Sequence, residues 1–188
     1  MNLDQPVSQL LFTAFDFETT GLTPGIDRIV ELGAVRFKGK EVLETFDRLV
    51  NPGMVISAGA TAVSGITDAM VIAQPEVGKI LPEFVSFAGE SILIAHNAPF
   101  DLAFLRAALL DHEMDDVKNL IIDTQELAKR AFPRQRSYGL QNLAVALNLP
   151  PNNAHRAADD ALMCMKLFNA CVETMSFMGE LTLGEVIP

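Results

Sequence analysis

The stretch Phe15-Asp16-Phe17-Glu18-Thr19-Thr20-Gly21 decides the fold, because two acids follow an apolar run near the start of the chain. The apolar residues before it predict a buried strand. Side chains alternate between the two faces of a strand, so Asp16 and Glu18 share one face and the two phenylalanines share the other. Neighbouring carboxylates are costly to desolvate unless a cation lies between them. The stretch alone leaves two interpretations open, a hydrated strand end and a metal site.

The length and composition of the chain limit the class of protein. The chain has 188 residues, 49% of them hydrophobic, and a formal net charge of −10. We expect one globular domain, residues 1–188, because the chain is long enough to bury a sizeable core. It shows neither a bilayer-length apolar run nor a signal-peptide pattern, which favours a cytoplasmic protein with no membrane partner. The acidic charge argues against nucleic-acid binding through net charge alone, but not against an enzyme that uses metal ions.

A cluster of four basic residues stands out against this acidic background: Lys129, Arg130, Arg134 and Arg136. Such a cluster is more often a solvated helix end and loop. The functional alternative is a local contact with phosphate. Both interpretations remain open from the sequence.

Turn residues and apolar periodicity divide the chain into strands and helices. Three strands joined by short turns come first and predict an antiparallel meander that ends near residue 50. Residues 54–74 are expected to form a long irregular segment, whose apolar residues Val55, Ile56, Val63 and Ile66 predict packing against the core. Strands at 91–95 and 120–122 then alternate with helices at 75–88, 97–111, 123–133, 137–147 and 155–175. This order predicts an α/β fold with a mixed sheet.

Two further acids begin apolar stripes on predicted helices. Asp101 lies one turn before Phe104 and Leu105, and Asp160 leads a similar stripe in the last long helix. A single acid near a helix start is explained by the helix dipole. Together with Asp16 and Glu18, however, these acids form a set that can hold a pair of Mg²⁺ or Mn²⁺ ions. Two such ions stabilise the attacking and leaving oxygens when a phosphodiester is displaced.

The three histidines have different claims to a chemical role. His155 precedes Asp160 by five residues, at the start of the last long helix. Beside a metal centre it is a candidate general base, because the pKa of imidazole lies near neutrality. His96 lies between a strand and a helix, where we expect a structural hydrogen bond. His112 follows the end of a helix, and we expect it to be exposed.

Three pieces of the chain resemble the three exonuclease motifs of the DnaQ-like DEDD superfamily. They are Asp16-Phe17-Glu18-Thr19-Thr20-Gly21, His96-Asn97-Ala98-Pro99-Phe100-Asp101 and His155-Arg156-Ala157-Ala158-Asp159-Asp160. The third has the His-x-Ala-x-x-Asp form of the DEDDh branch, which includes the proofreading epsilon subunit of bacterial DNA polymerase III, ribonuclease T and oligoribonuclease. The resemblance covers a core of about residues 10–175. It implies a ribonuclease H-like fold, a five-stranded mixed sheet with helices on both faces.

The resemblance also implies roles for individual residues. Two Mg²⁺ (or Mn²⁺) ions would be held by Asp16, Glu18, Asp101 and Asp160, with His155 as the general base. The terminal nucleotide would be bound by Thr19, Leu22, Val63, Ser64, Ile66 and Phe100. Epsilon-type proteins often have His-Gly-Ile where this chain has Ser64-Gly65-Ile66, so position 64 supplies no imidazole.

The implied activity is 3′→5′ exonucleolytic release of nucleoside monophosphates from single-stranded 3′ ends. The Thr19-Thr20-Gly21 form favours a proofreading or repair enzyme that acts on DNA, because oligoribonucleases typically carry Met before Thr-Gly. A DNA polymerase is a candidate partner. Two alternatives stay open: an RNA 3′ exonuclease of the ribonuclease T or oligoribonuclease kind, and a non-catalytic nucleic-acid or polymerase-binding module on the same fold.

Overall fold

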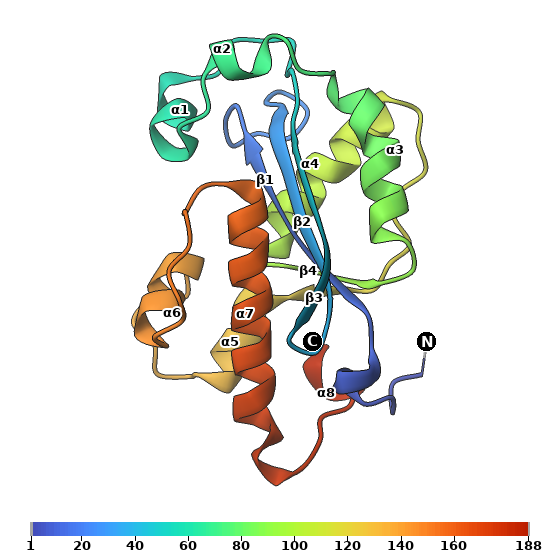
Figure 1. The fold of residues 1–188 in the computed structure, drawn as a ribbon, viewed down its shortest axis with the longest axis vertical. Coiled ribbons are helices and arrows are strands. Elements are labelled where there is room, and N and C mark those ends of the chain that lie inside the picture. The colour runs from blue at the N-terminus through green and yellow to red at the C-terminus, as the bar shows by residue number, and fades with distance from the viewer. Residues whose placement is uncertain (1, 188) are drawn as a thin grey trace.

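A five-stranded mixed sheet forms the centre of the computed structural model, which describes residues 2–187. The spatial order of its strands is β3-β2-β1-β4-β5 (Figure 1). The first three strands pair antiparallel, and β4 and β5 extend the sheet in parallel from β1. This confirms the predicted meander followed by strand–helix units. The strands are β1 Phe12–Thr19, β2 Ile29–Lys38, β3 Glu41–Leu49, β4 Ile92–Ala95 and β5 Ile121–Asp123.

Helices cover both faces of this sheet (Figure 1). One face packs against α5 (Thr124–Ala131), α6 (Leu140–Ala146) and α7 (Ala157–Met175). The opposite face packs against α3 (Val77–Ala88) and α4 (Ala98–Asp111). Among the described residues, no helix combines the length and apolarity that crossing a membrane requires. The remaining helices are short: η1 Val7–Gln9, α1 Ala58–Ser64, α2 Asp68–Val71, η2 Ser176–Met178 and α8 Leu183–Val186.

The side chains of β1 alternate between these two faces. Phe12 and Ala14 pack in the cluster that includes α7, whereas Phe15 and Phe17 pack in the cluster that includes α3 and α4. The Phe17 ring centroid lies 5.4 Å from that of Phe84 on α3. Because successive residues point to opposite faces, Asp16 and Glu18 face the α7 side. The period-two prediction is confirmed, and it directs both acids toward the start of α7.

The start of α7 lies directly against β2 at Gly33. A Cβ atom added to Gly33 would stand 2.1 Å from the carbonyl carbon of Ala157 and from the nitrogen of Ala158. Glycine is therefore required at this point by the close approach of two backbones. The contact places the first turn of α7, and with it Asp160, above β1 and β2.

The segment 54–74 differs from its predicted irregular form, because it contains the short helices α1 and α2. Ser57 caps α1 by accepting a hydrogen bond from the backbone N–H of Ala60 (3.1 Å), and Gly65 ends the helix at φ +71°. Helices of seven and four residues are too short to show a clear 3.6-residue period. The packing predicted for the four apolar residues of this segment is confirmed for two of them. Ile56 and Ile66 are buried beside Val30 and Val71, but Val55 and Val63 remain 75% and 58% exposed.

Candidate active site

A cavity of about 400 Å³ opens where the carboxyl end of β1 meets the start of α7. Its walls come from four parts of the chain that lie far apart in the sequence. The lining residues are Asp16, Phe17, Glu18, His96, Gly139, Leu140, Gln141, Asn142, His155 and Asp160. Three of the four predicted acids and the predicted base thus meet at one cavity.

Asp101 reaches the same place from the first turn of α4. Its carboxylate is almost fully buried and accepts a hydrogen bond from the backbone N–H of Phe17 (3.0 Å). Because Phe17 lies between Asp16 and Glu18 in the chain, this bond fixes Asp101 beside both acids of β1. The pairing of β1 with β2 is also irregular between Glu18 and Thr19, a distortion that changes the direction of side chains at a strand end.

The Asp160 carboxylate is oriented by three donors. One oxygen, Oδ1, accepts hydrogen bonds from Gln141 Nε2 (2.6 Å) and Asn152 Nδ2 (2.7 Å). The other, Oδ2, accepts one from the backbone N–H of His155 (2.8 Å). Gln141 belongs to α6 and Asn152 to the loop before α7, so the carboxylate joins three segments. Neither amide was expected from the sequence to belong to the site.

His155 occupies a strained backbone position at the entrance of this cavity. Its φ is +63°, a left-handed conformation that a non-glycine residue adopts only when its surroundings enforce it. The side chain is exposed, while its ligand atoms and those of Glu18 and Asp160 all lie within 4.8 Å of one another. The three groups are therefore close enough to share one cation or one water molecule.

The electrostatics of the cluster are unfavourable without a cation. Burial, followed by repulsion from Asp101, Asp160 and Glu18, raises the pKa of Asp16 well above its usual value. Burial likewise raises the pKa of Glu18 to about 7, and it raises the pKa of Asp101. Burial also raises the pKa of Asp160, although hydrogen bonds from Asn152 and His155 oppose the shift. A divalent cation with oxygen ligands would reverse this repulsion, so the donor set fits Mg²⁺ or Mn²⁺.

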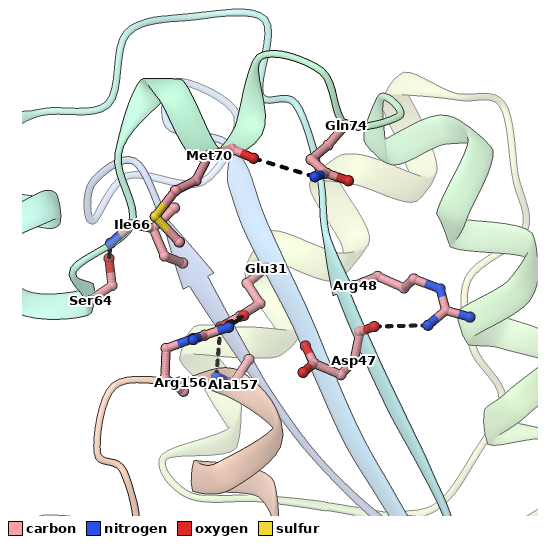
Figure 2. Close-up of polar contacts among 9 residues, drawn as sticks. All are labelled: Glu31, Asp47, Arg48, Ser64, Ile66, Met70, Gln74, Arg156 and Ala157. Atoms are coloured by element: carbon pink, nitrogen blue, oxygen red, sulfur yellow. Dashed lines mark hydrogen bonds and ion pairs between the residues drawn. The ribbon is translucent and has the colours of Figure 1, made fainter.

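An ion pair between half-buried Arg156 and fully buried Glu31 holds the start of α7 to β2 (Figure 2). Glu31 is fully buried and accepts hydrogen bonds from Arg156 Nε (3.1 and 3.2 Å) and Nη2 (2.5 Å). It also accepts one from the backbone N–H of Ala157 (2.9 Å), an otherwise unpaired donor at the helix start. The sequence carried a signal for Glu31, since it is a lone acid inside the apolar run 29–35. Glu31 lies outside the three motifs, so it was not among the predicted site residues.

A second cavity, of about 440 Å³, adjoins the first and shares Phe17 and Glu18 with it. It brings together four of the six residues predicted to contact the terminal nucleotide: Thr19, Leu22, Val63 and Phe100. Gly21, Ser57, Gly59 and Ala60 complete its lining. Most of this wall is apolar or backbone, a surface suited to a sugar and a base.

The other two residues predicted there, Ser64 and Ile66, do not line this cavity. Ile66 is fully buried with Val30, Ile56 and Val71 under α1 and α2. The Ser64 hydroxyl donates to the Ala60 carbonyl (3.1 Å) and accepts from the Ile66 N–H (3.2 Å; Figure 2). Both residues therefore belong to the fold of this segment, because the end of α1 turns them inward at Gly65.

The remaining two histidines lie as expected. His96 Nε2 donates to the Tyr138 carbonyl (2.7 Å), because a carbonyl can only accept, and Nδ1 then accepts from the Thr124 hydroxyl (3.0 Å). Burial lowers the pKa of His96, which keeps this arrangement neutral. His96 thus connects the wall of the site to the loop before α6. His112 is exposed.

The site combines four carboxylates and a histidine with an adjoining apolar cavity on a mixed α/β fold. This combination is typical of one class of protein, the nucleases that use divalent metal ions. The comparison with protein families is specific. The model of the RNase_T family, described as an exonuclease, matches residues 13–168. The chain therefore belongs to this exonuclease family, as its DnaQ-like motifs predict.

Individual relatives agree with this assignment. The DNA polymerase III subunit epsilon of Treponema pallidum is 40% identical over 163 residues, which cover 86% of this chain and 76% of that protein. A PolC-type DNA polymerase III of Thermotoga maritima is 37% identical over 97% of this chain, which spans only 13% of that relative's length. The solved structure of exonuclease X in complex with 5′ overhanging duplex DNA superposes with a TM-score of 0.72 at 26% identity, covering 95% of this chain and 99% of the other. The expected ribonuclease H-like fold is thereby confirmed.

Proposed function

We propose that this chain is a metal-dependent 3′→5′ exonuclease that releases nucleoside monophosphates from single-stranded DNA ends. The observation that carries the proposal is the convergence of Asp16, Glu18, Asp101 and Asp160 from three elements. Burial, together with repulsion between neighbouring acids, raises the pKa values of all four groups, so gathering them without a cation is energetically unfavourable. A bound divalent cation would offset that cost, which supports a metal site at these acids.

These four carboxylates would hold two Mg²⁺ or Mn²⁺ ions. When bound, such ions stabilise negative charge on the attacking and leaving oxygens of the phosphodiester. The chain itself supplies the geometry. Strand pairing fixes Asp16 and Glu18, the Phe17 N–H fixes Asp101, and three donors orient Asp160.

His155 is proposed as the base that takes a proton from the attacking water. Its imidazole is exposed at the entrance of the cavity, close to Glu18 and Asp160. Because its backbone N–H is bound to Asp160, the histidine is held in a fixed relation to the acids. Imidazole is the side chain that enzymes use most often as a general base.

The adjoining apolar cavity is proposed to bind the terminal nucleoside. Leu22, Val63 and Phe100 supply contact surface for the base and sugar. The Thr19 hydroxyl donates to the Gly21 carbonyl (2.5 Å), which holds the turn that forms one wall of this cavity. Glu18 borders both cavities and would therefore stand beside the bond that is cut.

The names of the relatives support DNA as the substrate and a DNA polymerase as a partner. The decisive experiment compares matched 5′-labelled DNA and RNA oligonucleotides, single-stranded and duplex, with Mg²⁺, Mn²⁺ or EDTA. We expect a stepwise ladder of shortened single-stranded DNA that depends on the metal. Equal digestion in excess EDTA would contradict a metal mechanism, and faster digestion of RNA would reassign the substrate.

A further inference from the structure

Six of the eight arginines bind other groups of the same chain. Five are paired with carboxylates, namely Arg28–Asp111, Arg36–Glu44, Arg48–Glu83, Arg106–Asp116 and Arg156–Glu31. Arg130 donates to the backbone carbonyls of Glu185 and Ile187. Arg134 and Arg136 differ, since both are exposed and neither has a hydrogen bond or ion pair to residues 2–187.

The basic cluster found in the sequence is therefore divided by the structure. Lys129 pairs with Glu126 one turn earlier, and Arg130 fastens the C-terminal segment. Both of these cations have a structural partner. In a chain whose net charge is −10, Arg134 and Arg136 are thus the two arginines that have no partner among residues 2–187, and they lie two residues apart on one loop.

This loop, residues 132–139, is fixed to the active-site cavity. The Tyr138 carbonyl accepts hydrogen bonds from His96 Nε2 (2.7 Å) and Gln125 Nε2 (3.3 Å), and its phenol donates to the Phe132 carbonyl (2.8 Å). Gly139 lines the cavity together with Asp16 and Asp160. Three residues of chain span at most about 10 Å, so the Arg136 backbone lies at the rim of that cavity.

The two adjoining cavities give the strand a direction. If the terminal nucleoside binds beside Leu22 and Phe100, the rest of the strand lies on the other side of the bond that is cut. It must then leave through the cavity that His96 and Gly139 line, toward the loop that carries both arginines. A strand on this path brings one phosphate per nucleotide past an otherwise acidic protein.

We propose that Arg134 and Arg136 bind backbone phosphates of the strand upstream of the cleaved bond. The inference rests on the proposed function, because it assumes that the nucleic acid enters this site 3′ end first. Guanidinium groups suit this task, since they stay charged and donate two parallel hydrogen bonds to phosphate oxygens. Contacts of this kind are independent of base sequence and determine affinity and register.

The test compares two double variants that change the net charge equally. One is Arg134→Ala/Arg136→Ala. The control is Lys79→Ala/Lys118→Ala, which removes two exposed lysines outside both cavities. Each protein is assayed on a single-stranded dT12 oligonucleotide and on the p-nitrophenyl ester of thymidine 5′-monophosphate, which carries no upstream phosphate. Binding of labelled dT12 is also measured by anisotropy in EDTA, from 50 to 200 mM KCl.

For the arginine variant we expect the ratio of kcat/KM on dT12 to kcat/KM on the ester to fall about tenfold. The plot of log affinity against log salt should become shallower by about 1.4, because two phosphate contacts are lost from a single strand. Arg134→Lys/Arg136→Lys should restore most of the salt dependence. The control should match the wild type in every measurement.

An arginine variant that behaves like the control in both the ratio and the salt slope would overturn the proposal. A failure of the proposed function has a different signature, since the wild-type protein would then cleave neither substrate. In that case the anisotropy titration still decides whether the two arginines bind the strand.

Discussion

The two halves of the acidic site are built by different means. Asp16 and Glu18 are set by regular strand pairing, with Asp16 opposite Gly33 and Glu18 opposite Glu31 on β2. Asp160 and His155 lie at a junction of loop and helix, where polar side chains and a left-handed backbone hold them. The strand half follows from a repeating backbone geometry, whereas the helix half depends on individual side chains. Substitutions should therefore affect the two halves differently.

The largest effect is expected on the strand half. Asp16→Asn keeps the shape of the side chain but removes a metal-binding charge, so exonuclease activity should fall by about 1000-fold or more. The same change removes repulsion from Asp101, Asp160 and Glu18, so the metal-free protein should become more stable at pH 8. Activity is measured on labelled DNA and stability by urea unfolding in EDTA. Asp115→Asn, at an exposed position, is the control and should change neither quantity.

The next effect concerns the ion pair that anchors the helix half. Arg156→Met leaves Glu31 fully buried without its cation, which should lower the free energy of unfolding by about 3 kcal/mol. Arg48→Met breaks an exposed pair with Glu83 and should cost less than about 1 kcal/mol. Adding Glu31→Gln to Arg156→Met should recover part of the loss, since the unpaired charge is then gone. Equal losses for the two arginine variants would show that the pair does not anchor α7.

A smaller effect is expected when one donor to Asp160 is removed. Gln141→Ala takes away the 2.6 Å hydrogen bond to Oδ1 and leaves the other two donors in place. Groups that orient a metal ligand typically contribute tenfold or more to affinity, so half-maximal activity should need about ten times more Mn²⁺. Gln74→Ala, on the far side of α2, is the matched control (Figure 2). An unchanged Mn²⁺ requirement would mean that Asp160 is held without α6.

The smallest effect is a shift of thermal stability with pH. The pKa of Glu18 rises from 4.5 to about 7 on folding, so between these values the folded chain binds more protons than the unfolded chain. The free energy of unfolding must then decrease as pH rises through this window. In EDTA we expect Tm to fall by a few degrees from pH 5.5 to 8. If residues 1–188 form one domain, as we propose, the protein should unfold in a single transition. Mn²⁺ should restore Tm at pH 8. A Tm that increases with pH in EDTA would contradict the predicted direction of the shift.

The contrast between the halves also explains what the sequence could predict. The alternation around Asp16 and Glu18 is visible within seven residues, so the strand, its faces and its acids were predictable. Asp101, Asp160 and His155 were found because each begins a helix with an apolar stripe or belongs to a recognised motif. Ser64 and Ile66 were misplaced because the turn at Gly65, which directs them inward, belongs to helices too short to detect.

Contacts between distant parts of the chain could not be predicted from local sequence patterns. Glu31 and Arg156 are separated by 125 positions, and the local sequence around either residue does not predict its partner. Gln141 and Asn152 were hidden for the same reason, because each acts on Asp160 from a separate segment. The division of the basic cluster likewise required the structure, since the partners of Arg130 lie at the other end of the chain.

Gly33 sets the distance between the two halves. With a Cβ at this position, two backbones would collide at 2.1 Å, and neither can rotate away as a flexible side chain does. Real Cβ atoms essentially never approach other atoms closer than 3.0 Å, so even the methyl group of Gly33→Ala would push the first turn of α7 away from β2 by about 1 Å. A displacement of that size carries Asp160 and His155 away from the strand acids, and errors of about 1 Å can reduce a reaction rate 100-fold. Gly33, which has no side chain, thus sets how closely the helix half of the proposed site approaches the strand half.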